Sequence, residues 1–120
     1  MVIVRTTNTT KILNMFLDCP FFLNGFVISG EKNLMLLLAG EDLASLESII
    51  DERLRPDEDV QSADFSIIIS SIKDFVMPIK LTERSLNKPP CGIDYKECQA
   101  SHENRCFGCP AISRYKGIFW

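Results

Sequence analysis

The stretch from Asn33 to Leu54, NLMLLLAGEDLASLESIIDERL, carries the two hydrophobic patterns on which a fold prediction can be built. Its first part, Asn33 to Ala39, is an apolar run of strand length that ends at Gly40. Its second part, Glu41 to Leu54, has acidic residues in the first turn and arginine in the last, which suits a helix dipole. The apolar residues of this part recur at helical spacing: Leu43, Leu46, Ile50 and Leu54. The stretch therefore predicts a strand followed by an amphipathic helix.

Three predicted elements precede this stretch. The alternating, β-branched N-terminus is typical of a strand, and apolar residues then recur at helical spacing until Pro20, which cannot continue a helix. An aromatic and β-branched segment follows, and a turn around Gly30 joins it to the next strand as a hairpin. The three elements are a strand at Met1–Arg5, a helix at Thr9–Asp18 and a strand at Phe21–Ser29.

Two apolar segments follow the helix. Asp64 to Ile72 is densely β-branched, and we expect it to be a central strand. Asp74 to Leu81 alternates, and Pro78 would place a further strand there at an edge or a bulge. The order of elements predicts an α+β protein with a ferredoxin-like βαββαβ sandwich, in which helices cover one face of an antiparallel sheet. We expect residues 1–84 to form this α+β domain.

The composition is that of an ordinary globular protein. The chain has 120 residues, of which 46% are hydrophobic and 24% charged, and this is enough for one core and too little for two. The longest apolar run, Leu34 to Ala39, is far shorter than the roughly 20 residues of a membrane helix. The N-terminus lacks the pattern of a secretory signal. We therefore expect a cytoplasmic protein with no membrane segment.

Residues 85–120 have no persistent helical or strand period, and they contain four of the five cysteines. The four are Cys91, Cys98, Cys106 and Cys109. The two-residue spacing of the last pair lets both sulfurs approach one ion from a tight turn, and Gly108 can adopt the positive φ that such a turn needs. In a reducing compartment, clustered cysteines favour metal ligation over structural disulfides. We therefore expect residues 85–120 to be a cysteine-rich, metal-binding tail packed on the domain.

Three accounts of these cysteines remain open. Four thiolates at about 2.3 Å from one zinc ion would form a closed structural site, and His102 in the same loop is a possible extra ligand. Cys109-Pro110 is similar to the cysteine-proline that ends bacterial ferredoxin runs, so an iron–sulfur cluster is the alternative cofactor. Free thiols or disulfides, with three possible pairings, are the third account. Cys19 is expected to be a small buried residue, and a fifth ligand only if the tail folds back onto it.

The segment CGIDYKEC, Cys91 to Cys98, resembles the CGxDCxxC opening of small cysteine-rich, predicted metal-binding proteins of archaea and anaerobic bacteria. In those proteins a later cysteine pair with an intervening glycine often follows, as Cys106 and Cys109 do here. The resemblance covers Cys91 to Pro110 and implies metal binding without naming a substrate. Tyr95 stands where the pattern has a further cysteine, which removes one ligand and argues against a larger cluster.

No motif in the chain predicts an enzyme. There is no GxGxxG or GxxxxGK[ST] motif for nucleotide phosphates, and the single histidine disfavours a serine or cysteine hydrolase. The predicted function is a metal-binding protein with a structural zinc site. One alternative is an iron–sulfur electron-transfer or redox accessory protein. Another is an adaptor that binds a protein, a second copy in a homodimer, or single-stranded nucleic acid through the basic and aromatic segment from Arg114 to Trp120, which includes Tyr115 and Lys116. We expect Ile118 to Trp120 to pack against the domain.

Overall fold

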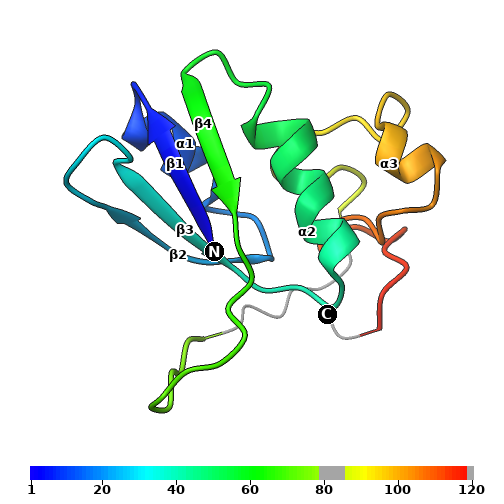
Figure 1. The fold of residues 1–120 in the computed structure, drawn as a ribbon. Helices are drawn as coiled ribbons and strands as arrows, with labels where there is room; N and C mark the ends of the chain where they lie inside the picture. Colours follow the sequence, from blue (N-terminus) through cyan, green and yellow to red (C-terminus); the bar gives the residue numbers. More distant parts are fainter. Residues whose placement is uncertain (79–85, 119–120) are drawn as a thin grey trace.

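The structure is a computed structural model that describes residues 1–78 and 86–118 (Figure 1). Its main elements follow the order strand, helix, strand, strand, helix, strand, and a short helix lies in the tail. The elements are β1 Val2–Thr6, α1 Thr9–Phe16, β2 Phe22–Val27, β3 Leu34–Leu38, α2 Leu43–Ile49, the π-helical turn η1 Ile50–Leu54, β4 Val60–Phe65 and α3 Gln99–His102. Within the described ranges, no helix has the length and apolar character needed to cross a bilayer.

The four strands form one antiparallel sheet in the order β2-β3-β1-β4. β1 lies between β3 and β4, so that Val2 is opposite Leu36 on one side and Phe65 on the other. The helices α1 and α2 cover one face of this sheet (Figure 1). The sequence prediction of an α+β, ferredoxin-like fold is therefore confirmed.

The hydrophobic core lies between this face of the sheet and the helices. On β1, Val2 and Val4 are fully buried while Ile3 between them is only half-buried, as the two-residue period of a strand requires. The buried strand residues pack in one cluster with side chains of α1 and η1. The fully buried members from these helical elements are Ile12, Phe16, Ile50 and Leu54.

Polar side chains set where the two main helices begin. Asn8 accepts a hydrogen bond from the Lys11 N–H at 3.0 Å, and Asp42 accepts one from the Ser45 N–H at 3.1 Å. Such caps satisfy backbone donors that the first helical turn leaves unpaired. Because Asp42 is the cap, the second helix begins at Leu43 rather than at the predicted Glu41.

The prediction of a central strand at Asp64–Ile72 is wrong. The strand in this region, β4, is an edge strand that ends at Phe65. Phe65 lies opposite Val2, and the Ser66 N–H donates to the Met1 carbonyl at 2.8 Å, so the pairing of β4 with β1 is seen up to this point. Ile69 beyond this point is 93% exposed. A β-branched run favours extended backbone, but the neighbouring strand β1 determines how many of its residues are paired.

The further strand predicted at Asp74–Leu81 is absent from its described part. Residues 74–78 carry no strand, and residues 79–81 lie outside the described residues. Phe75 and Val76 are exposed, so no sheet buries the alternating side chains. Alternation alone therefore does not form a strand where no neighbouring strand pairs with the segment.

The tail packs against α2 (Figure 1). The Phe107 N–H donates to Ser45 Oγ at 3.0 Å, and the Tyr115 hydroxyl donates to Glu41 Oε1 at 2.8 Å. Tyr115 is buried in the main core cluster. The prediction that Ile118 packs on the domain is wrong, because its side chain is 93% exposed and only its backbone N–H reaches Glu41.

Phe119 and Trp120, predicted to pack beside Ile118, lie outside the described residues. The predicted division of the chain after residue 84 also falls outside them, among residues 79–85. The division into 1–84 and 85–120 therefore stays a prediction.

Candidate functional site

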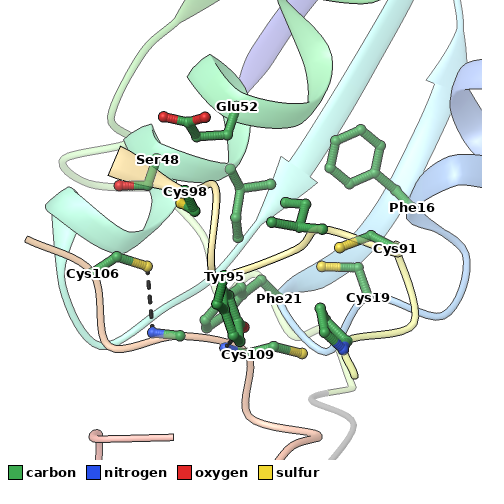
Figure 2. Close-up of a pocket in the computed structure, with 14 residues that line it drawn as sticks. Phe16, Cys19, Phe21, Ser48, Glu52, Cys91, Tyr95, Cys98, Cys106 and Cys109 are labelled. Carbon is green, nitrogen blue, oxygen red and sulfur yellow. Dashed lines mark hydrogen bonds between the residues drawn. The ribbon is translucent and has the colours of Figure 1, made fainter. Parts of the chain in front are cut away.

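A small apolar cavity lies between the tail and the domain, and all five cysteines of the chain line it (Figure 2). The domain contributes Phe16, Phe21 and Ile49, and the tail contributes Ile93 and Tyr95 beside its cysteines. The cavity has a volume of about 40 Å³. A single water needs about 10–15 Å³ on this scale, so the cavity has room for about three or four atoms of that size.

A tight turn after α1 places Cys19 at this cavity. The Cys19 N–H donates to the Phe16 carbonyl at 2.9 Å, and the Phe22 N–H donates to the Cys19 carbonyl at 3.0 Å. Pro20 is fully buried beside it. Cys19 is buried, as predicted, and the tail folds back over it. We expect Cys19 to be a possible fifth ligand only if the tail folds back onto it, and the structure meets this condition.

Local hydrogen bonds hold the tail cysteines at the opposite wall. A turn closed by the Gly92 N–H and the Pro89 carbonyl, at 3.0 Å, carries Cys91. The Cys109 N–H donates to the Tyr95 hydroxyl at 2.6 Å. The Cys106 sulfur accepts from the Gly108 N–H at 3.3 Å, and Gly108 has the predicted positive φ, 89°. Both halves of the tail thus reach the same cavity.

The five thiols do not form one coordination sphere. Figure 2 shows the sulfurs of Cys19 and Cys91 next to each other, with Cys98 and Cys106 drawn farther from them. Among residues 1–78 and 86–118, no group of three or more His, Cys, Asp or Glu side chains is arranged to hold a metal ion. The predicted ligands are gathered around one cavity, and the predicted zinc site stays a prediction.

The possible extra ligand, His102, is not brought to this cavity. Its side chain is exposed, and its Nε2 lies 2.5 Å from the Lys96 carbonyl oxygen. Its place in α3 directs it to a polar hollow formed with Lys96 and Arg114 on the outside of the tail. The structure therefore does not join His102 to the cysteines.

Burial sets the acidity of the thiols in the cavity. Burial raises the pKa of Cys19 to about 12, and the nearby Cys109 and Cys91 thiols contribute further. Burial likewise raises the pKa of Cys109 to about 11. It is also the main cause of the raised pKa of Tyr95. These two thiols are thus protonated near neutral pH, which makes them weak nucleophiles in the metal-free protein.

Tyr95 and Cys19 are the residues that sequence reasoning undervalued. Tyr95 was noted only as a missing cysteine, yet its hydroxyl fixes the backbone of Cys109. No local signal marks Cys19, because its contact with the tail spans more than 70 residues of chain. Only the folded arrangement brings it to the site.

A second surface lies on the face of the sheet opposite the helices. Ile3 is opposite Met35, and Met35 is opposite Phe26, so these three side chains share one face. Val2 and Val4 point to the core, which places the three on the other side of the sheet. Phe26 is 39% exposed, and the exposed isoleucines after β4 add apolar surface to the molecule.

Comparison with known proteins assigns the domain rather than the tail. No curated protein and no solved structure gives a significant match to this chain. A family profile described as the Lrp/AsnC ligand binding domain matches residues 2–77, a range that includes β1 to β4, α1 and α2. The family suggested by the resemblance at Cys91 to Pro110, cysteine-rich metal-binding proteins, is therefore wrong. The match covers more than half of the chain, and the chain belongs to the Lrp/AsnC ligand-binding domain family.

Proposed function

We propose that this protein is a small ligand-binding regulatory protein whose ligand is a thiophilic metal ion, zinc, held by cysteines where the tail meets the domain. The observation that carries the proposal is the gathering of all five cysteines around one apolar cavity. The family match supports a ligand-binding role for residues 2–77. The cavity supplies a place where such a domain and its tail take up a ligand together.

The chemistry and size of the cavity favour a single zinc ion. Thiolates are soft ligands that select zinc, Cu(I) or iron–sulfur clusters. A cavity of about 40 Å³ has room for one ion, whereas a four-iron, four-sulfide cluster brings eight inorganic atoms. An iron–sulfur redox protein is the alternative function, and it requires the tail to move away from the domain.

Metal analysis of protein purified without oxygen tests this function. We expect about one zinc per chain, as for a site with a single ion. The proposal would be overturned if the protein contained neither zinc nor iron and all five thiols reacted freely. A brown protein with iron and acid-labile sulfide would replace zinc by the alternative cofactor.

A second proposal concerns the partner, which we take to be a second copy of this chain. The apolar face with Ile3, Met35 and Phe26, together with the exposed Ile69 and Ile72, supports it, because large exposed apolar surfaces mark interaction sites. Light scattering is expected to show a dimer for the wild-type chain and a weakened dimer for Phe26→Asp. A monomer at all concentrations would remove this proposal.

The nucleic-acid alternative loses one of its aromatic residues. The Tyr115 ring is buried and its hydroxyl donates to Glu41. Stacking of bases requires an accessible ring face, so Tyr115 does not offer one. Phe119 and Trp120, the other aromatic residues of the segment, lie outside the described residues, and this alternative stays a prediction.

A further inference from the structure

We propose that the ion is bound by Cys19, Cys91 and Cys109, so that the Lrp/AsnC domain itself contributes a ligand and the ion ties the tail to it. This inference rests on the proposed function and changes its ligand set. It replaces the four tail cysteines by one cysteine of the domain and two of the tail. Cys98 and Cys106 then have structural positions outside the coordination sphere.

The placement of the side chains supports this set. The sulfurs of Cys19 and Cys91 lie next to each other at the cavity, and Cys98 and Cys106 are drawn farther from them (Figure 2). Cys109 and Cys91 both contribute to the raised pKa of the buried Cys19 thiol, so both lie within electrostatic reach of it. An ion at about 2.3 Å from its ligands needs sulfurs that converge on one point, and this trio comes nearest to that arrangement.

We infer that side-chain rotation closes the site. Hydrogen bonds hold the Cys19 backbone to Phe16 and the Cys109 backbone to Tyr95, and Cys91 lies in the turn closed by Gly92 and Pro89. A cysteine has one rotatable side-chain bond, and a change of rotamer moves its sulfur by about 3 Å. The thiols of this structure are not yet in a coordinating array, and we infer that the ion draws them together.

Charge favours zinc over Cu(I) at three thiolates. Zinc leaves a net charge of −1 on the buried site, whereas Cu(I) leaves −2, and buried uncompensated charge is costly. Three protein ligands leave one tetrahedral position of zinc for an external ligand. The site is therefore an open one, in contrast to the closed structural site predicted from the sequence.

The ion would make docking of the tail depend on the ligand. Cys19 follows α1, whereas Cys91 and Cys109 lie in the tail, so one ion joins segments that are distant in the sequence. The free energy of metal binding then adds to the contacts of the tail with α2. Loss of the ion would weaken the docking of the tail, and a change of this kind can regulate what the protein binds.

Two cysteines of equal burial provide a matched test. Cys19 is 9% exposed and Cys98 is 7% exposed, so Cys19→Ser and Cys98→Ser perturb packing to a similar degree. Zinc affinity of the full chain is measured by competition with a chromophoric chelator. We expect Cys19→Ser to weaken zinc binding by at least about 100-fold, above the 10–100-fold typical of losing an outer-shell partner. Cys98→Ser is expected to stay within about threefold of wild type.

The outcomes separate this inference from the proposed function. If Cys98→Ser loses zinc, alone or together with Cys19→Ser, the three-cysteine set is overturned while zinc binding stands. If the wild-type chain binds no zinc, the proposed function itself fails. If Cys19→Ser does not fold, alkylation of the wild-type chain with and without zinc replaces this test. We expect zinc to slow the modification of Cys19 and to leave that of Cys98 unchanged. The reverse pattern would overturn the inference.

Discussion

Replacing Tyr115 by phenylalanine tests how the tail is held. The substitution removes the hydroxyl that donates to Glu41 Oε1 at 2.8 Å and keeps the buried ring. A hydrogen bond to a charged group contributes about 1.5–3 kcal/mol. Glu41 keeps the Ile118 N–H as a donor at 3.1 Å, so its carboxylate is not left without partners and the lower end of the range applies. We expect Tyr115→Phe to lower the free energy of unfolding by about 1.5 kcal/mol.

Urea denaturation followed by circular dichroism measures this loss. With a slope of about 1–3 kcal/mol per molar urea, the midpoint should fall by roughly 0.5–1.5 M. The matched control is Glu31→Gln, which removes the exposed ion pair with Arg5 and should cost less than about 1 kcal/mol. A Tyr115→Phe midpoint equal to that of wild type would refute the assignment of Tyr115 as the anchor of the tail.

Three further predictions follow from the same structure. Asp42→Ala removes the cap of α2 and should lower stability by about 1 kcal/mol in thermal unfolding, whereas Asp42→Asn keeps a good cap and should cost clearly less; equal costs would contradict the capping role. Ile12→Ala in the core should cost about 2–5 kcal/mol and Ile12→Val about 0.5–1.5 kcal/mol in urea unfolding; similar small losses would mean that α1 is not packed on the sheet. The metal-free protein should lose stability as pH rises from about 9 towards 11, because unfolded thiols ionise there while folding holds the pKa of Cys19 and Cys109 at about 12 and about 11; stability that rises over this range would contradict their burial.

Local patterns were sufficient to predict the fold because each main element carries its own signal. The alternation at β1, the apolar run at β3 and the spacing from Leu43 to Leu54 specify element types, and Asn8 and Pro20 mark the helix between them. The order of these elements then favours one sandwich topology. The sheet order could not be read from the sequence: β4 is an edge strand that pairs only with β1 in the described sheet.

The tail could be predicted only in part, for a different physical reason. The four clustered cysteines indicate soft-ligand chemistry, and the positive φ of Gly108 agrees with the predicted turn. Which thiols face one another depends on how the tail docks, and the tail is held by contacts to Glu41, just before α2, and to Ser45 on α2. Both residues belong to an acidic, polar helix start that predicts only a solvated surface. Sequence spacing therefore predicts a cluster of cysteines but not which thiols face one another.

The position of Cys19 changes how the domain and tail are related. Had the tail cysteines faced only one another, a metal ion would stabilise the tail alone and leave the Lrp/AsnC domain unaffected. Cys19 instead projects from the turn after α1 into the cavity that Cys91 and Cys109 line from the tail. A ligand bound there contacts both parts, so its binding free energy is coupled to their association. Regulation by such a ligand then needs no movement within the sheet. The ligand shifts the equilibrium between a docked and an undocked tail on α2.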